Sequence, residues 1–308
     1  MHSQHQPTHP GSSPAPAPAI LTGVILALSL AQPGIGSEQD APSACLWRVQ
    51  SSNTTAYIQG SVHLLSDDAY PLPSQVEMAF KASERIVLEM DLAIMTDPEA
   101  QLELVIKGML PEGKTLHDVL SPQTLELAED CAQDIGLSMV AFKRYKPWMF
   151  VMALTSTRLQ QLGFSAENGL DWHFYKRAKE LEKAIVGLET LDEQLALFES
   201  VVEEDQDAFV RQSLEDFATL ETDIAGIMEA WTHGDLDALS EALFQNLREY
   251  PNIQRILIDD RNAKWMRTLN GMMQSGVTTM VIVGAGHLPG EGGLIAQLRA
   301  SGYTVEQL

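Results

Sequence analysis

The chain has 308 residues, enough for one large domain or two interleaved halves, and its apolar content is that of a soluble globular protein. The formal net charge is −22, and the acidic residues are spread along the whole sequence. So strong a negative charge argues against nucleic acid and anionic membrane surfaces as partners, because both would repel the protein.

Residues 1–36 differ from the rest and are predicted to be a signal peptide. The apolar run ILTGVILALSLA has the length of a signal-peptide core and is too short to span a bilayer comfortably. Gly34 and Gly36 follow at a spacing suited to signal peptidase, which predicts a periplasmic or secreted protein with no membrane span after cleavage. No Lys or Arg precedes the apolar run, so an uncleaved N-terminal anchor or a wrongly assigned start stays open.

Residues 37–308 begin with signals for alternating strands and helices. CLWRVQ and TAYIQGSVH predict a hairpin, and Ser74 with Glu77 predicts a capping box that opens a helix. RIVLEMD then predicts a strand. Helices are predicted from Asp97, which precedes a proline in the first turn, and from Ser121. A largely buried helix is expected after Pro147.

The second half repeats this alternation. GLDWHFYKRAKELEK predicts an amphipathic helix and AIVGLET a strand, after which Thr190 and Glu193 form a second capping box. The acidic stretch 204–250 and a long segment that ends at Gly276 are predicted helical. VTTMVIVG, GGLIAQLRASG and YTVEQL predict a buried strand, a helix and a terminal strand. The expected fold is α/β, with a mixed central sheet of N- and C-terminal strands and a large helical insertion around 92–250.

The two cysteines, Cys45 and Cys131, exclude a cysteine-based zinc site by their number and spacing. In an exported protein they could form a disulfide, but Cys131 lies in a helical pattern and suits a buried free thiol equally well.

Two Gly-x-x-His units carry the main chemical signal. GSVH and GAGH each follow an apolar strand, and they place His63 and His287 where that strand ends. Ligands of open α/β sheets bind at the carboxyl ends of strands, and a glycine there permits a close approach of the backbone. His117 and His233 stand in polar contexts and His173 on an amphipathic helix, so we expect structural or solvated roles for these three.

Two glutamates and an arginine complete the candidate site. Glu89 ends an apolar strand, where a buried carboxylate needs a partner, whether that partner is a ligand or an arginine. Glu189 holds the matching place in AIVGLET, although it could serve only the start of the following helix. Arg261 is predicted to face the same crevice and to bind a carboxylate or an oxyanion. Its alternative is a surface ion pair with Asp259 or Asp260.

Two histidines and a glutamate from separate strands suit a divalent ion with an open position for water. We therefore predict His63, Glu89 and His287 as ligands of Mn²⁺, Co²⁺ or Zn²⁺. The helix-borne His-Glu-x-x-His motif of many zinc peptidases is not present. Gly-x-Ser-x-Gly is also absent, which disfavours a standard serine hydrolase. The glycine-rich GEGGL lacks the Walker lysine and the dinucleotide spacing, so no nucleotide site is expected.

These residues resemble the TraB/GumN family, which is related to Tiki-type proteins and more distantly to erythromycin-esterase-like and ChaN-like proteins. The resemblance covers nearly the whole chain after the leader, in the family's order, through GSVHLL, IVLEMD, KPW, GLDWHF, GLETLDEQ, RNAKW and VIVGAGHLPGEGGL. It implies that the paired Gly-x-x-His units, Glu89 and Arg261 are the active residues. It also implies a metal-dependent peptidase, since Tiki-type relatives are described in that way.

Three functions follow as hypotheses. The first is an exported metal-dependent hydrolase that acts on a peptide or a small molecule, with Arg261 at the oxyanion or a substrate carboxylate. In that scheme Glu189 serves as a base or supports the metal ligands. The second is metal-free hydrolysis in which one histidine is a general base oriented by Glu89. The third is a periplasmic protein that captures a peptide or signal without turnover. The oligomeric state is left open.

Overall fold

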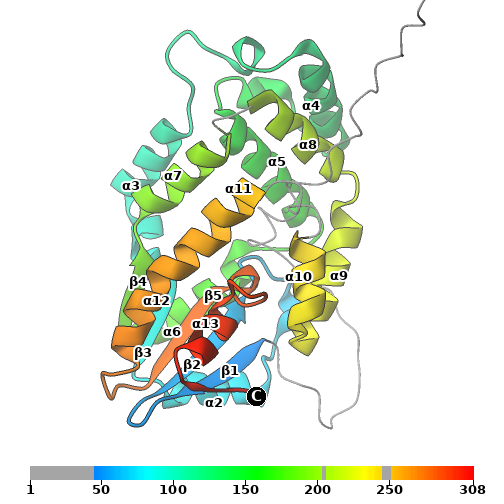
Figure 1. The fold of residues 1–308 in the computed structure, drawn as a ribbon. Coiled ribbons are helices and arrows are strands. Elements are labelled where there is room, and N and C mark those ends of the chain that lie inside the picture. The colour runs from blue at the N-terminus through cyan, green and yellow to red at the C-terminus, as the bar shows by residue number, and fades with distance from the viewer. Residues whose placement is uncertain (1–44, 203–205, 245–250) are drawn as a thin grey trace, which may run out of the picture.

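The computed structural model describes residues 45–202, 206–244 and 251–308 (Figure 1). The predicted signal peptide and parts of the acidic stretch 204–250 lie outside the described residues. A six-stranded sheet in the order β4-β3-β5-β2-β1-β6 forms the centre of the fold. Its strands are β1 (Leu46–Gln50), β2 (Thr55–Ser61), β3 (Arg85–Met90), β4 (Ala184–Glu189), β5 (Thr279–Gly284) and β6 (Thr304–Gln307).

The sheet is mixed, as predicted. β4, β3, β5 and β2 run parallel, whereas β1 is antiparallel to both β2 and β6. Ser61 of β2 pairs with Gly284 of β5, and Met90 of β3 pairs with Glu189 of β4. The carboxyl ends of the four parallel strands therefore meet at one edge of the sheet.

In the described residues, two of the connections between parallel strands carry a single α-helix each, and the other two are long and carry several. α2 (Ser74–Ala82) joins β2 to β3, and α13 (Leu294–Ala300) joins β5 to β6. Between β3 and β4 lie α3 (Pro98–Lys107), α4 (Pro122–Asp134), α5 (Pro147–Gln161) and α6 (Leu170–Glu180). Between β4 and β5 lie α7 (Leu191–Val202), α8 (Gln206–Asp216), α9 (Leu220–His233), α10 (Leu236–Phe244), α11 (Pro251–Gln254) and α12 (Asp260–Met272). β4 thus divides the predicted helical insertion.

Local capping follows the sequence at Asp97, Ser121 and Thr190 but not at Ser74. Asp97 accepts a hydrogen bond from the Glu99 amide at the start of α3. Thr190 and Glu193 exchange the two bonds of a capping box at the start of α7, at 2.9 and 3.2 Å. The capping box predicted at Ser74 is wrong. Extended Pro73 precedes α2, so Ser74 is already helical and its hydroxyl contacts a neighbouring glutamine side chain.

Helices cover both faces of the sheet. α12 and α13 lie in front of the strands in Figure 1, and α2 and α6 lie behind them. Phe80 of α2 and Phe174 of α6 pack together with ring centroids 5.0 Å apart. All six residues of β5 are buried because this strand is covered on both sides. None of the described helices combines the length and apolar character needed to cross a membrane.

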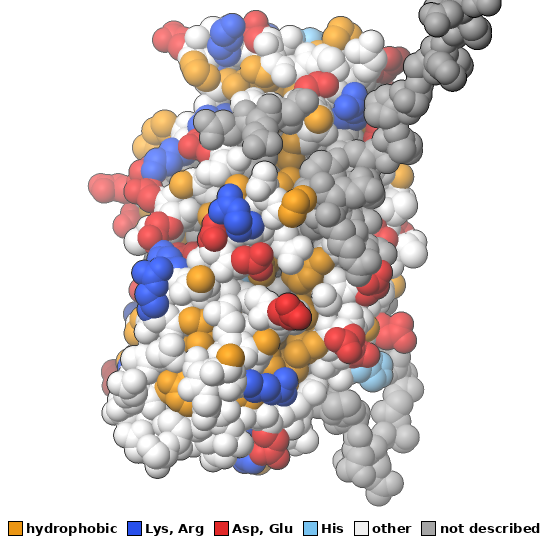
Figure 2. All heavy atoms as spheres, in the orientation of Figure 1, with side chains coloured by type: hydrophobic (Ala, Val, Ile, Leu, Met, Phe, Trp, Pro, Cys, Tyr) orange, Lys and Arg blue, Asp and Glu red, His pale blue; other side chains and the backbone are white. Residues whose placement is uncertain are grey.

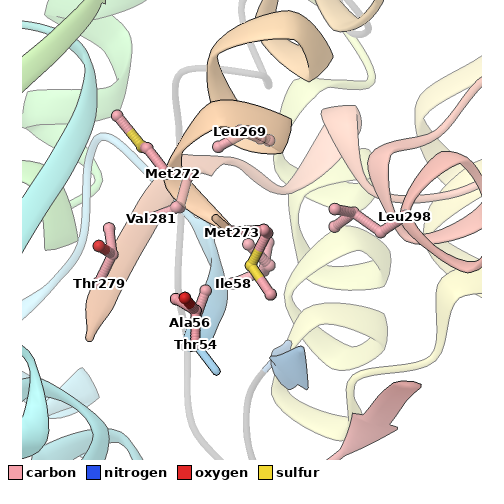
Figure 3. A pocket seen from close by; sticks show the side chains of 9 residues that line it. All are labelled: Thr54, Ala56, Ile58, Leu269, Met272, Met273, Thr279, Val281 and Leu298. Atoms are coloured by element: carbon pink, nitrogen blue, oxygen red, sulfur yellow. The ribbon is translucent and has the colours of Figure 1, made fainter. Parts of the chain in front are cut away.

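The packing between α12, α13 and the sheet leaves one small apolar space near the amino ends of β2 and β5 (Figure 3). The cavity measures about 10 Å³, so it holds no more than one water molecule. It is lined by Thr54, Ala56, Ile58, Leu269, Met272, Met273, Thr279, Val281 and Leu298. It lies at the end of the strands opposite to the predicted site. Cys45 and Cys131 are buried free thiols, so the described chain contains no bond between them.

The chain that follows β2 is held tightly by the start of α6. The Leu170 amide donates to the Val62 carbonyl at 3.1 Å, and Leu65 exchanges backbone bonds with Ser165. A side-chain carbon on Gly169 would lie 2.0 Å from the carbonyl oxygen of His63. Gly169 therefore permits the close contact between α6 and the histidine-bearing loop.

Two glycine substitutions test this contact. Gly169→Ala should lower the free energy of unfolding by about 1–3 kcal/mol, because the added methyl group meets backbone that cannot move away. Gly226→Ala is the matched control, since Gly226 is exposed inside α9 with no neighbouring atom within 4 Å. It should raise stability by about 0.5–1 kcal/mol through helix propensity. Urea unfolding followed by circular dichroism measures both, and equal effects would contradict the close packing at Gly169.

Candidate active site

The four parallel strands each bring one predicted residue to the same edge of the sheet. Glu89 is the next-to-last residue of β3, and Glu189 is the last residue of β4. His63 follows the end of β2, and His287 follows the end of β5. Arg261 reaches this edge from the first turn of α12. The structure thus gathers all five predicted side chains into one cluster.

The Arg261 guanidinium lies at the centre of the cluster and contacts three of the other four side chains. Nη2 donates to Glu89 Oε2 at 2.5 Å and to Glu189 Oε2 at 2.8 Å. Nε lies 3.1 Å from both carboxylate oxygens of Glu189. Nη1 donates to His287 Nε2 at 3.0 Å. The Arg261 side chain is only 11% exposed, so this is a buried ion-pair network.

The alternative of a surface ion pair for Arg261 is wrong. Asp260 pairs with Arg255 on the outside of the helix instead. A π-helical turn (Arg255–Asp259) joins α11 to α12 just before Arg261, and the Leu257 carbonyl in that turn accepts from Nη1 at 3.2 Å. Turns of this kind are frequent at functional sites. One turn later, the Trp265 ring lies 4.7 Å from the guanidinium carbon, a cation–π contact.

His287 is fixed by an asparagine that sequence reasoning did not assign. Asn262 donates through Nδ2 to the carbonyl oxygens of His287 and Gly292, at 3.2 and 2.9 Å, so its Oδ1 must be the atom that faces the imidazole. That oxygen lies 2.8 Å from His287 Nδ1 and can only accept. The proton therefore belongs on Nδ1, and Nε2 presents a lone pair to Arg261. Trp265 closes the other side of the ring at a centroid distance of 4.3 Å.

His63 is fixed in the same way by a carboxylate. Its Nδ1 lies 2.6 Å from Asp171 Oδ2, and the Ser61 hydroxyl donates to the same oxygen. Asp171 stands in the first turn of α6 and is buried. The free Nε2 atom of His63 faces Glu89.

Glu89 lies between the two imidazoles. Its Oε1 atom is 3.8 Å from Nε2 of His63 and 3.8 Å from Nε2 of His287. The same oxygen accepts the Gly284 amide at 2.7 Å, which fixes the carboxylate at the end of β5. Both histidines therefore present their Nε2 atoms to one oxygen of one buried glutamate.

The surroundings shift the pKa values of the two histidines in opposite directions, so that one is charged and the other is neutral. Burial disfavours a charged His63, but the Asp171 carboxylate and Glu89 outweigh it and raise the pKa of His63 to about 9. Burial and the Arg261 guanidinium lower the pKa of His287 to about 3. Burial also favours a neutral Glu89, but Arg261 and the histidines hold the pKa of Glu89 well below its usual value. Near neutral pH the site holds a charged His63, a neutral His287 and an ionised Glu89.

These donors suit a divalent ion by their chemistry and orientation, because metal-bound histidines characteristically bond their second nitrogen to a carboxylate or amide. Two ligands of a tetrahedral ion at 2.1 Å stand about 3.4 Å apart, somewhat closer than the 3.8 Å between each imidazole nitrogen and Glu89. Within the described ranges, no group of three or more His, Cys, Asp or Glu side chains is arranged so that it could hold a metal ion as it stands. An ion would require a small inward movement and the release of His287 Nε2 by Arg261.

Sequence reasoning assigned no role to Asp171, Asn262, Ser61 or Trp265. Each stands within or beside a motif already noted, since Asp171 belongs to GLDWHF, Ser61 to GSVH, and the other two to RNAKW. Residue type alone did not separate them from ordinary helix and loop residues. Only the docking of α6 and α12 onto the strand ends shows what these side chains contact.

Fold and site together define an α/β protein whose parallel strands end in two histidines and two glutamates around one arginine. A family model described as TraB/PrgY/gumN matches residues 45–307. The chain belongs to the TraB/PrgY/gumN family, which confirms the resemblance found in the sequence.

The individual relatives share only a small part of their sequence with this chain. Proteins named YbaP from Shigella flexneri and Escherichia coli (strain K12), both described as uncharacterized, are each 26% identical over 80% of this chain and 89% of their own length. The metalloprotease TIKI1 of Danio rerio is 22% identical over 85% of this chain and 62% of its own length. No solved structure matches the chain.

Two arginine substitutions test the buried network. Arg261→Ala should lower the free energy of unfolding by about 3–5 kcal/mol, because it leaves the Glu89 and Glu189 carboxylates buried and unpaired. Arg255→Ala removes an exposed ion pair in the same helical segment and should cost less than about 1 kcal/mol. Urea unfolding of both variants measures the difference. A small loss for Arg261→Ala would contradict a buried charge network at the sheet edge.

Proposed function

We propose that the protein is an exported, metal-dependent hydrolase that cleaves a peptide bond, with His63, Glu89 and His287 as the metal ligands. The observation that supports this proposal is the convergence of two histidine Nε2 atoms, each 3.8 Å away, on the same oxygen of Glu89. Each imidazole is oriented through its Nδ1 atom, as metal-binding histidines are. A peptide or another small molecule with a scissile carbonyl is the proposed substrate.

The similarity to known proteins supports hydrolysis as the class of reaction, but not a particular substrate or metal. A distant relative, TIKI1, carries the description metalloprotease, and the chain shares the TraB/PrgY/gumN family model over residues 45–307. The relatives named YbaP are described as uncharacterized, so they suggest no activity. The substrate, the choice among Mn²⁺, Co²⁺ and Zn²⁺, and the periplasmic or secreted location are therefore part of the proposal.

Each side chain of the cluster has a role in this scheme. A bound divalent ion supplies a Lewis acid and an acidified water. Arg261 lies beside the ligands with its fork of N–H donors, so it is suited to hold an oxyanion or a substrate carboxylate. Both oxygens of Glu189 already accept from Arg261, so we assign Glu189 to holding the arginine in place rather than to proton transfer.

Metal-free hydrolysis with a histidine base has less support. His63 carries a proton near neutral pH, since its pKa is raised to about 9 by Asp171 and Glu89 against the effect of burial. His287 is neutral, but its Nε2 lone pair accepts from Arg261 Nη1 at 3.0 Å. Neither imidazole offers a free lone pair to a water in this arrangement.

Metal binding and turnover test the proposal directly. Purified protein, stripped with a chelator and dialysed against Mn²⁺, Co²⁺ or Zn²⁺, should retain about one ion per chain by elemental analysis. His63→Ala and His287→Ala should abolish both retention and cleavage of a peptide library, because each removes one ligand. His117→Ala is the control, since His117 is an exposed residue away from the cluster, and it should leave both unchanged.

The other outcomes select the other functions. Full cleavage by chelator-treated, metal-free protein would contradict the metal-dependent scheme and favour a histidine base. Stoichiometric capture of a peptide that survives substitution of both histidines, with no turnover, would favour a binding protein instead of an enzyme.

A further inference from the structure

The two histidines face the same glutamate oxygen but are held by different means. The side chain of His287 is 1% exposed and is packed against Trp265, whereas the side chain of His63 is 20% exposed. Close packing restricts the rotation of His287, and hydrogen bonds with the Asn262 amide and the Arg261 guanidinium complete its orientation. The side chain of His63 is the more exposed of the two, so packing restrains its ring less than that of His287.

The anchor of His63 is a carboxylate and not an amide. Asp171 Oδ2 accepts from His63 Nδ1 at 2.6 Å and from the Ser61 hydroxyl as well. A charge-assisted bond of this kind is about twice as strong as a neutral one. Ser61 is the buried last residue of β2, so it ties the Asp171 carboxylate to the rigid sheet. One oxygen of Asp171 thereby links α6 to β2 and to the loop that carries His63.

We propose that Asp171, braced by Ser61, is a positioning residue that holds His63 with its Nε2 atom directed at Glu89. The proposal rests on the metal-binding role of His63 for its functional consequence, but the orientation itself exists without an ion. Loss of the Asp171 carboxylate releases the histidine that packing restrains less. The ion position then loses one of its three donors for most of the time.

The first arm of the test reads the orientation in metal-free protein. Protein labelled with ¹⁵N-histidine should show a strongly deshielded proton on one Nδ1 nitrogen, the mark of a hydrogen bond to a carboxylate. His63→Gln assigns that signal by removing it. Asp171→Ala should lose the signal, whereas Asp171→Asn should keep an Nδ1 proton hydrogen-bonded to the amide oxygen, with a smaller shift.

The second arm measures affinity for Mn²⁺ or Co²⁺ by equilibrium dialysis. Asp171→Ala should weaken binding about 10- to 100-fold, the usual effect of removing the partner of a metal-bound histidine. Asp171→Asn should recover most of the loss, because the amide oxygen can still accept from Nδ1. Ala178→Gly serves as the structural control, since Ala178 is a buried residue of the same helix with no polar side chain. It should lower stability and leave affinity unchanged.

The outcomes separate this proposal from the proposed function. A deshielded signal that persists in Asp171→Ala, or equal weakening of binding by Ala178→Gly, would overturn the positioning role. If the wild-type protein binds no ion while the Asp171→Ala variant loses the signal, Asp171 positions His63 but the protein is not a metal-dependent hydrolase.

Discussion

The site depends on the neutralisation of two buried carboxylates by one arginine. Glu89 and Glu189 lie at the ends of neighbouring parallel strands and are each less than one-tenth exposed, so their burial is costly unless a cation pairs with them. Arg261 bonds both, and in doing so it fixes α12 against the ends of β3 and β4. The position of α12 in turn places Asn262 and Trp265 around His287. The Arg261 guanidinium thus holds the two glutamates and His287 in place. His63 is held separately, by Asp171.

Strand register decides which side chains reach this edge. Gly284 lies opposite Ser61, and its amide bonds Glu89, which ties three strands together at the level of the site. A slip of one residue in β3 would turn Glu89 to the opposite face of the sheet. Residues more than two hundred positions apart therefore meet without any local sequence relation between them.

The sequence predicts the strands, the two Gly-x-x-His positions and the capping box at Thr190, because these depend on short-range periodicity and backbone chemistry. It fails at Ser74 because Pro73 occupies the cap position. For Arg261, the nearby aspartates suggested local ion pairs, yet residues one or two apart on a helix do not face each other. The actual partners are carboxylates on strands distant in sequence. Asp171 and Asn262 likewise acquire their contacts only when α6 and α12 dock.

Charge balance links the resting site to the proposed ion. In the described structure, the carboxylates of Glu89, Glu189 and Asp171 face two cations, Arg261 and the protonated His63, which leaves one negative charge in excess. A histidine must be unprotonated to bind a metal, so a divalent ion would replace the His63 proton and remove that excess. The same ion would compete with Arg261 for the His287 lone pair. The arginine therefore stabilises the cluster without an ion, and its release from His287 makes a lone pair and an N–H donor available together.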